Sequence, residues 1–517
     1  MKFNKTLRAI VGAGLCGIGL WLALSVPYQS HTFLIGAGGC RLVTDIVEPV
    51  GQPEGSTPKG YIVLLHGLAA NKRIMSYLTT GFAAQGLRVF VPDLPGHGRS
   101  TGPFSYDRSE ECSANLLREL IARGLLDPER TILAGHSLGG ADALRVASHI
   151  PVAGAIAISP APMRPVPGIS PEMMPFHEFG ALPPHSLVMS AAWDSGLMRN
   201  GARDLVPSPA DGTSQYVVIP RSSHVSILFD AAAMSSAQNW AAAVLHLDSK
   251  PALPTRRGLL GFLAGFLGII LLAGPFLRET LQNKKSAEPA IEIASARVKS
   301  RAFFDQALVA LAAVAILYLW NPLRVLHLFQ GDYLASFLLI LGVTLLLLHW
   351  NALRHLIGTR PKGAPSSRPI YFTLLAAAFA AFLLHFLVTA WIDLTFSEAW
   401  LTASRWARFT PLFLAVLPYH AAEELALGPA SPDNAWRRLL AALSLRLIGW
   451  AAIVAAIFVL HSGEVLLVLL SPYFALCCLL QAWGMKVVRE VTASPAAAAL
   501  FGAILLAGFC LVVFPTT

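Results

Sequence analysis

The chain alternates between two kinds of hydrophobic pattern. Between about residues 41 and 247, short apolar runs rich in β-branched side chains are separated by stretches with helical periodicity. This alternation predicts a parallel sheet with helices on both of its faces. The runs that predict strands are Tyr61–Leu65, Leu87–Val91, Thr131–Ala134, Ala153–Ile158, Ser186–Ser190 and Gln215–Ile219.

Outside this region the apolar runs are long enough to cross a lipid bilayer, which takes about 20 residues of helix. The pattern predicts three parts: an N-terminal transmembrane segment in residues 1–37, an α/β domain in residues 38–250, and an all-α polytopic transmembrane domain in residues 251–517 with about eight helices. The predicted spans lie at about residues 7–26, 259–277, 303–320, 334–350, 370–392, 411–427, 439–460, 464–482 and 496–514.

The first span resembles a secretion signal. Lys2, Lys5 and Arg8 precede an apolar stretch that ends at Val26, and this order of a charged and an apolar region is typical of signal sequences. No clear cleavage site between small residues follows the apolar stretch. We therefore expect a signal anchor that stays in the membrane.

Composition and charge support a membrane protein. Hydrophobic residues make up 55% of the chain and charged residues 13%, and the mean hydropathy is +0.57. The net charge is +9, yet residues 38–250 contain 16 Lys and Arg against 18 Asp and Glu. The excess positive charge therefore belongs to the membrane segments, and the sequence gives no support for nucleic-acid binding.

The positive charges also predict an orientation, because cytoplasmic loops are enriched in Lys and Arg. With a cytoplasmic N-terminus, 18 basic residues at the ends of the spans and in their loops fall on the cytoplasmic side, against five on the other side: Arg256, Arg257, Arg324, Arg405 and Arg408. This asymmetry predicts that the α/β domain lies on the non-cytoplasmic, periplasmic or extracellular face.

One motif indicates nucleophilic chemistry. The apolar run Thr131–Ala134 leads into Gly135-His136-Ser137-Leu138-Gly139-Gly140, and a helical stretch follows. A strand that enters a helix through Gly-x-Ser-x-Gly is a nucleophile elbow, in which small neighbours let the serine occupy a strained, exposed turn. A serine that only caps a helix is the alternative reading of such a short match.

Two more motifs, in the expected order, extend this pattern. His66-Gly67 follows the first predicted strand, and the segment Pro92–Ser100 follows the next. Together with the Ser137 motif they resemble the α/β-hydrolase superfamily, especially its monoacylglycerol-lipase-like and serine-aminopeptidase-like branches. The resemblance covers about residues 41–247 and implies a doubly wound, mostly parallel sheet that carries a serine hydrolase site.

The resemblance also implies the other site residues. The family's catalytic order of serine, acid and histidine points to Ser137, Asp194 and His224, since the latter two follow later predicted strands. Asp204 competes for the acid position. The backbone amides of Leu68 and Leu138 occupy the positions that form the family's oxyanion hole.

The predicted spans contain a second group of ionisable residues. His420, Glu423 and Glu424 lie on one predicted helix at spacings that place them on nearby faces, and His385 lies on the preceding span. The group is a candidate intramembrane polar site, whether a metal site, a proton relay or a protease centre. The Glu-Glu pair resembles the start of a CAAX-protease-like motif, although Gly428 stands where that family has arginine. Carboxylates that reach water at a helix end are the simpler alternative.

These features predict a membrane-embedded serine hydrolase that cleaves an ester, thioester or amide through an acyl-enzyme. The expected substrate is a small molecule or a lipid acyl group, and membrane lipid is an expected partner. An acyltransferase, or a transporter or lipid-handling protein with an appended hydrolase domain, remains an alternative. We expect no cofactor and no metal, and the sequence leaves protein partners unknown. Cys40 and Cys112, the cysteines of residues 38–250, would be a disulfide or two free thiols. A proline-rich loop, Pro160–Pro184, is expected to form a lid.

Overall fold

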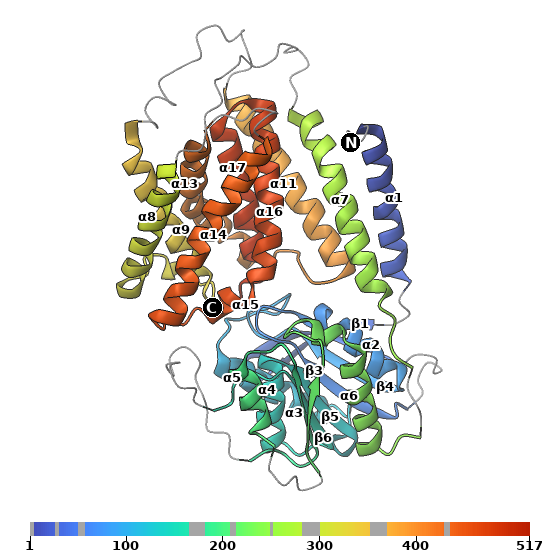
Figure 1. The fold of residues 1–517 in the computed structure, drawn as a ribbon. Helices are drawn as coiled ribbons and strands as arrows, with labels where there is room; N and C mark the ends of the chain where they lie inside the picture. Colours follow the sequence, from blue (N-terminus) through green and yellow to red (C-terminus); the bar gives the residue numbers. More distant parts are fainter. Residues whose placement is uncertain are drawn as a thin grey trace. The chain divides into compact units, whose positions relative to one another are not determined.

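The computed structural model describes residues 5–25, 30–49, 57–164, 181–206, 213–248, 252–281, 300–351, 370–428 and 435–517. Their contacts divide the chain into two units. The sheet unit comprises Gly19–Phe262, Ile392–Ala399 and Pro515–Thr517, and the helical unit comprises Met1–Ile18, Leu263–Trp391 and Trp400–Phe514. Figure 1 shows the elements of both units.

The sheet unit is built on eight strands in the order β1-β2-β4-β3-β5-β6-β7-β8. All neighbours from β4 onward pair in parallel, whereas β1 with β2 and β2 with β4 are antiparallel. The predicted fold class, a mostly parallel sheet followed by a helical region, is confirmed. The strands are β1 (Ser30–Ala37), β2 (Cys40–Val47), β3 (Gly60–Leu65), β4 (Leu87–Pro92), β5 (Thr131–His136), β6 (Gly154–Ile158), β7 (Ser186–Ala191) and β8 (Gln215–Ile219).

The first two strands were not among the predicted ones. They form a hairpin whose two turn residues, Gly38 and Gly39, have φ of +53° and +77°, and glycine adopts such angles without the strain that a side chain would cause. Most of β1 is exposed, including its apolar residues Phe33 and Leu34, so it does not follow the pattern of the buried strands.

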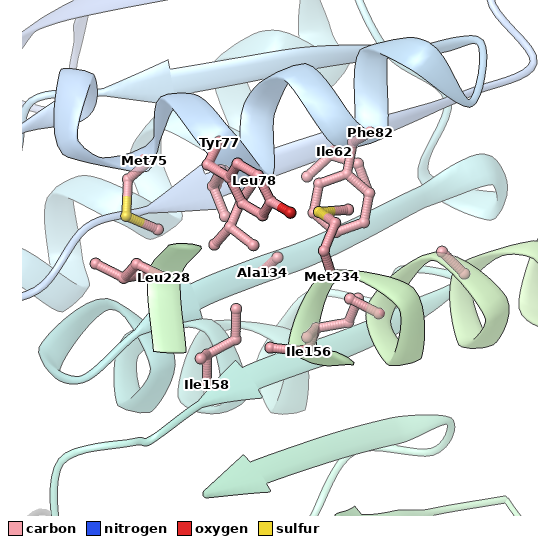
Figure 2. Packing of buried hydrophobic residues seen from close by; sticks show 14 of the residues in the cluster. Ile62, Met75, Tyr77, Leu78, Phe82, Ala134, Ile156, Ile158, Leu228 and Met234 are labelled. Atoms are coloured by element: carbon pink, nitrogen blue, oxygen red, sulfur yellow. The ribbon is translucent and has the colours of Figure 1, made fainter. Parts of the chain in front are cut away.

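Helices cover both faces of the sheet, which explains why β3, β5 and β7 are buried along their whole length. Figure 2 shows Leu78 and Phe82 of α2 and Met234 of α6 directed towards Ile62 and Ala134 of the strands. The helices of this unit are α2 (Ser76–Ala84), α3 (Tyr106–Ala122), α4 (Leu138–His149), α5 (Gly196–Arg203) and α6 (Ala231–Val244), with short 3₁₀ turns η1 (Lys72–Met75), η2 (Pro128–Arg130) and η3 (Ser226–Phe229).

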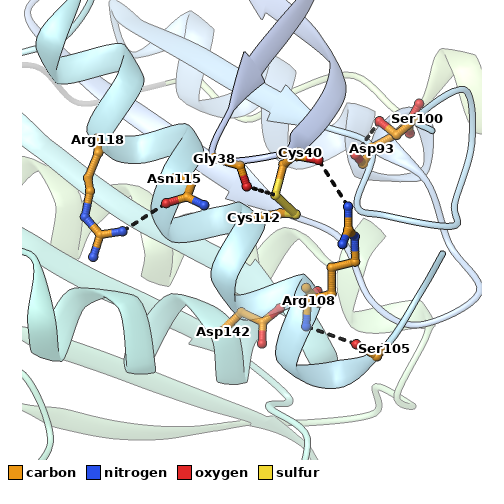
Figure 3. Close-up of a disulfide and its surroundings, with 12 residues drawn as sticks. Gly38, Cys40, Asp93, Ser100, Ser105, Arg108, Cys112, Asn115, Arg118 and Asp142 are labelled. Carbon is orange, nitrogen blue, oxygen red and sulfur yellow. Dashed lines mark hydrogen bonds between the residues drawn. A yellow bond between two sulfur atoms is a disulfide. The ribbon is translucent and has the colours of Figure 1, made fainter. Parts of the chain in front are cut away.

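Cys40 and Cys112 form a disulfide that joins the start of β2 to α3, with a Cα–Cα distance of 5.5 Å (Figure 3). Both residues are buried. This outcome selects the disulfide from the two alternatives that the sequence left open. The link closes a sequence separation of 72 residues, and loops of that size gain about 4 kcal/mol in the chain-entropy description.

The long apolar helices lie mainly in the helical unit, and they include α1 at the N-terminal end of the chain. Among the described residues, seven helices are long and apolar enough to cross a membrane: α1, α7, α8, α9, α11, α14 and α17. The bounds are α1 (Lys5–Leu24), α7 (Arg257–Leu281), α8 (Ser300–Leu319), η4 (Arg324–Leu326), α9 (Gly331–Leu348), α11 (Ile370–Thr395), α12 (Ala403–Trp406), α13 (Phe409–Leu427), α14 (Ala435–Val459), α15 (Val465–Leu469), α16 (Ser471–Thr492) and α17 (Pro495–Val513).

Two predicted spans correspond to helices outside these seven. α13 and α16 are not among the seven helices, because each carries several polar or charged side chains. The predicted span at residues 464–482 is wrong in its bounds, since the chain forms the short α15 and then begins α16 at Ser471. Pro472 lies in the first turn of α16, where its missing N–H removes no helical hydrogen bond, and this favours a new start there.

Candidate active site

Ser137 occupies the turn between β5 and α4. Its backbone has φ of 53° and ψ of −116°, a region that non-glycine residues avoid unless the surroundings impose it. The neighbouring glycines make this turn possible. A Cβ on Gly135 would lie 2.1 Å from the carbonyl oxygen of Gly139, and one on Gly139 would lie 2.4 Å from that of Leu65. The two glycines of the motif are therefore required by close backbone approach.

A chain of hydrogen bonds runs from the serine through the predicted partners. His224 Nε2 lies 3.0 Å from Ser137 Oγ, and His224 Nδ1 lies 2.9 Å from Asp194 Oδ1. Asp204 does not join this chain, because it ends α5 on the surface beside Arg203. The structure thus brings Ser137, Asp194 and His224 together and leaves the competing acid outside.

Asp194 is held as a carboxylate by its surroundings. Its Oδ2 accepts hydrogen bonds from Ser159 Oγ at 2.7 Å and from the backbone N–H of Ala191 at 3.2 Å. Burial alone would raise the pKa of Asp194, but the interaction with His224 and these hydrogen bonds outweigh it, so the pKa lies below its usual value. The ionised acid can fix the tautomer of His224, with the proton on Nδ1 and the lone pair of Nε2 facing the serine hydroxyl.

Two buried side chains that sequence reasoning missed support this arrangement. Ser159 follows β6 and positions Asp194. His136, the residue before the serine, donates from Nε2 to the backbone oxygen of His224 at 2.7 Å and so holds the loop of the base. Burial, with the nearby His224 next, lowers the pKa of His136 to about 3, which keeps it neutral. Its place inside the Gly-x-Ser-x-Gly motif was visible, but its partner lies 88 residues away.

The loop that follows β3 lies beside the serine. A Cβ on Gly67 would lie 3.1 Å from Ser137 Cβ, so the predicted oxyanion residue Leu68 is in the immediate neighbourhood. His66 Nε2 accepts from Leu94 N at 2.9 Å, and His97 Nε2 accepts from Ala69 N at 3.1 Å. Burial lowers the pKa of His66 to about 4. Both histidines therefore join this loop to the segment after β4.

Comparison with known proteins decides the family. A model of the alpha/beta hydrolase family matches residues 62–501. The chain belongs to the alpha/beta hydrolase family. The resemblance that the three motifs predicted is thereby confirmed.

This α/β hydrolase has curated relatives with esterase and lipase names. It is 33% identical over 119 residues to a monoacylglycerol lipase of Mycolicibacterium smegmatis, which covers 23% of this chain and 40% of the relative. It is 34% identical over 103 residues to a pimeloyl-[acyl-carrier protein] methyl ester esterase of Edwardsiella ictaluri, covering 20% of this chain and 36% of the relative. The chain thus spans less than half the length of these relatives. Among solved structures, an esterase from Thermogutta terrifontis has a TM-score of 0.32 at 16% identity, over 42% of this chain and 99% of that one.

The predicted intramembrane group of this α/β hydrolase is largely assembled in the helical unit. His420 Nδ1 lies 3.3 Å from Glu423 Oε2, and Gln481 Nε2 lies 3.0 Å from His420 Nε2. Glu424 Oε2 accepts from Arg438 at 2.6 Å. His385 stands apart: its ring packs against Trp406 and Phe509, and no described interaction joins it to the other three.

Arginines complete this group, and sequence reasoning used them only to predict orientation. Arg446 donates to both oxygens of Glu423, at 2.8 Å and 2.9 Å, and Arg489 lies 3.5 Å from Glu424. A cavity of about 60 Å³ borders the group and is otherwise lined by apolar side chains. Among the described residues, no cluster of His, Cys, Asp and Glu has the arrangement of a metal site.

The predicted lid lies mostly outside the described residues, since residues 165–180 of Pro160–Pro184 fall there. What the structure does describe next to the site is exposed apolar surface. Trp193 precedes the acid and is 70% exposed, and Val225 follows the base and is 52% exposed. Isolated exposed apolar residues are common, but two that flank the acid and the base provide an apolar border to the site.

Proposed function

We propose that the protein is a membrane-embedded serine hydrolase that cleaves an ester, thioester or amide through an acyl-enzyme. Ser137 is the nucleophile, His224 the general base and Asp194 the residue that orients the base. The observation that carries the proposal is the continuous chain from Ser137 Oγ to His224 Nε2 at 3.0 Å and from His224 Nδ1 to Asp194 Oδ1 at 2.9 Å. This is the arrangement that activates a serine hydroxyl at neutral pH.

The reaction proceeds in two steps. Ser137 Oγ attacks the carbonyl carbon while its proton passes to His224 Nε2, and the oxyanion that forms accepts hydrogen bonds from the backbone N–H groups of Leu68 and Leu138. His224 then gives the proton to the departing alcohol, thiol or amine, which leaves an acyl group on Ser137. A water molecule, deprotonated by His224, attacks this ester and releases the acid and the free serine.

An acyl substrate with an apolar chain fits the surroundings best. Trp193 and Val225 present apolar surface beside Asp194 and His224, and the curated relatives include a monoacylglycerol lipase and a methyl ester esterase. The seven apolar helices would hold the chain in membrane lipid. We therefore propose a lipid or lipid-linked acyl group as the substrate.

Two independent observations support a hydrolase domain outside the cytoplasm. The basic residues at the ends of the spans favour this orientation. Cys40 and Cys112 form a disulfide in the sheet unit, and disulfides persist mainly in oxidising compartments. Protease added to spheroplasts, in which the cytoplasmic membrane is the only barrier, should digest the domain, whereas full protection under conditions that spare a cytoplasmic marker would contradict the orientation.

Labelling with a fluorophosphonate probe tests the catalytic proposal. In membranes that contain the full chain, the native protein should label, and Ser137→Ala and His224→Ala should not. Ser148→Ala, which removes an exposed hydroxyl from the same helix that follows Ser137, is the matched control and should label like the native protein. Equal labelling of Ser137→Ala would refute the proposed nucleophile.

A further inference from the structure

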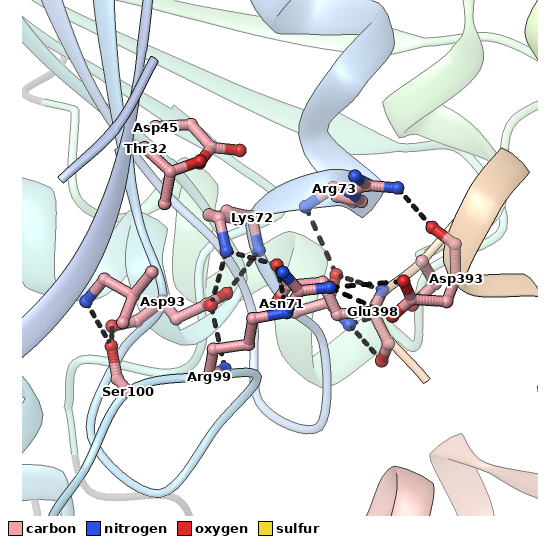
Figure 4. Close-up of polar contacts among 12 residues, drawn as sticks. Thr32, Asp45, Asn71, Lys72, Arg73, Asp93, Arg99, Ser100, Asp393 and Glu398 are labelled. Carbon is pink, nitrogen blue, oxygen red and sulfur yellow. Dashed lines mark hydrogen bonds and ion pairs between the residues drawn. The ribbon is translucent and has the colours of Figure 1, made fainter. Parts of the chain in front are cut away.

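A segment from the C-terminal half of the chain forms part of the sheet unit beside the active site. Residues 392–399, more than 300 positions after β3, belong to this unit, and Figure 4 shows their contacts. Both the nitrogen and the oxygen of the Asn71 side-chain amide form hydrogen bonds with the segment. Its Nδ2 donates to Ser397 Oγ at 2.8 Å and to the backbone oxygen of Glu398 at 3.2 Å, and its Oδ1 accepts from the N–H of Glu398 at 3.2 Å.

The next residue, Lys72, lies at the centre of a buried group of charges. Its Nζ donates to Asp93 Oδ2 at 2.8 Å and also to Glu398 Oε1. Its backbone N–H donates to Asp93 Oδ1 at 2.9 Å. All three side chains are at most 3% exposed. Arg99, which is partly exposed, lies 3.5 Å from Glu398 and 3.2 Å from Asp393.

These contacts hold the C-terminal end of the loop that carries Leu68, namely Asn71 and Lys72, where the loop passes into η1. The N-terminal end is held at His66, which binds Leu94, and the middle at Ala69, which binds His97. Because Gly67 lies against Ser137, a shift at the C-terminal end of the loop would move the Leu68 N–H relative to the reacting carbonyl.

The segment after β4 is fastened from a distance as well. Thr516, in the stretch Pro515–Thr517 of the sheet unit, donates from its N–H to Gly96 O at 3.0 Å and accepts from Phe104 N at 2.7 Å. This pairing holds the turn that contains His97. Two remote segments of the chain therefore fasten the two loops that surround the predicted oxyanion donor.

The buried charge group is not arranged for stability alone. Within the described part of the chain, Glu398 Oε2 is buried without a hydrogen-bond partner, which is costly for a carboxylate. Buried ion pairs often stabilise a fold less than apolar residues of the same size would, and they are retained in some proteins because they specify one geometry. A group that defines the position of one loop, at some cost in stability, matches the second case.

We propose that Glu398 and Asn71 are positioning residues of the active site: segment 392–399 holds the loop His66–Lys72 so that the Leu68 N–H points at the oxyanion. The inference rests on the proposed function. It means that residues 38–250 do not contain the complete site, and that the chain beyond residue 391 supplies one of its supports. It also gives the long C-terminal region a role in catalysis besides membrane attachment.

The test compares Glu398→Ala with Glu48→Ala in the full-length protein, using p-nitrophenyl butyrate as substrate. Glu48 is the matched control, because it pairs with Arg88 at 3.0 Å at the opposite end of β4. Glu398→Ala should lower kcat at least tenfold with KM changed less than twofold, since the oxyanion forms after binding. A trifluoromethyl ketone inhibitor, which forms an oxyanion on Ser137, should lose affinity by the same factor. Glu48→Ala should change none of these values.

Two further variants distinguish a positioning role of Glu398 from a general loss of folding. Glu398→Gln retains an oxygen within reach of Lys72 and should recover most of the lost kcat. If Glu398→Ala does not fold, Ser397→Ala decides, because it removes one hydrogen bond from Asn71 and should lower kcat at least twofold at unchanged KM. Native kcat in folded Glu398→Ala, or in Ser397→Ala when it decides, would overturn the positioning role. Failure of the native protein to react with the fluorophosphonate probe at Ser137 would instead refute the proposed function.

Discussion

Two buried groups of polar residues in this protein each pair a histidine with a carboxylate, but they differ in what the second nitrogen of the histidine contacts. In the sheet unit, His224 lies 2.9 Å from Asp194, and in the helical unit His420 lies 3.3 Å from Glu423. The other nitrogen of His224 faces the hydroxyl of Ser137, whereas the other nitrogen of His420 faces the amide of Gln481. The first group ends on the hydroxyl that we propose as the nucleophile, and the second ends on another polar side chain.

The carboxylates differ in the same way. Both oxygens of Glu423 accept hydrogen bonds from Arg446, so its charge is neutralised by a guanidinium. Asp194 has no ion pair with Lys or Arg among the described residues, and its hydrogen-bond donors are Ser159, Ala191 and His224. An acid without a cation could stabilise an imidazolium on His224, which the proposed general base catalysis requires. Residue type alone therefore does not distinguish a catalytic group from a structural ion-pair group.

The largest expected effect compares the two acids directly. Asp194→Asn should lower kcat for p-nitrophenyl butyrate by about 10²–10⁴, because it removes the charge and the preferred tautomer of His224. Glu423→Gln should leave kcat per folded molecule within about twofold of native. Steady-state kinetics on purified full-length protein measures both. Comparable losses in the two variants would show that the helical group takes part in the reaction.

The second prediction concerns stability in the helical unit. Arg446→Met leaves the Glu423 carboxylate buried without its cation, a change that typically costs about 3–5 kcal/mol. The double variant Arg446→Met with Glu423→Met removes both charges and should recover a large part of that loss. Thermal unfolding in detergent, followed by tryptophan fluorescence, measures the difference. A single variant as stable as the native protein would mean that the pair is solvated.

The third prediction concerns the covalent link of the sheet unit. Cys40→Ser with Cys112→Ser should lower the stability of this unit by about 2–4 kcal/mol, because the unfolded chain gains the freedom of a long loop. The free cysteines among the described residues, Cys16, Cys477, Cys478 and Cys510, provide the control. Replacing Cys478 with Ala should change the unfolding of the sheet unit little, and an equal loss would contradict this account.

The smallest expected effect is a pH dependence in α4. Burial raises the pKa of Asp142 to about 7, and Ser109 Oγ donates to its Oδ2 at 2.7 Å. Because the folded state then holds a proton that the unfolded state has already released, stability should fall as the pH rises from 5 to 7, by roughly 2 kcal/mol. Asp142→Asn keeps the hydrogen bond and should remove this dependence. Parallel unfolding curves of variant and native protein across this range would contradict the buried, protonated acid.

Much of the site could be predicted from the sequence because it depends on local rules. The turn at Ser137 needs glycines within two positions, and Asp194 and His224 follow strands in a family-specific order. The parts that could not be predicted depend on partners far along the chain. Arg446 meets Glu423 only through helix packing, and Glu398 meets Lys72 across 326 positions. The hairpin at Gly38 and Gly39 was missed for a different reason, because its first strand is mostly exposed.

Direct detection of the acyl-enzyme tests the central claim most closely. The purified full-length protein is mixed with p-nitrophenyl butyrate, quenched in acid within one turnover, digested and analysed by mass spectrometry. A butyryl group should appear on the peptide that contains Ser137 and should be absent in Ser137→Ala. Hydrolysis of the ester by the native protein with no acyl group on Ser137, or with the group on another residue, would contradict it.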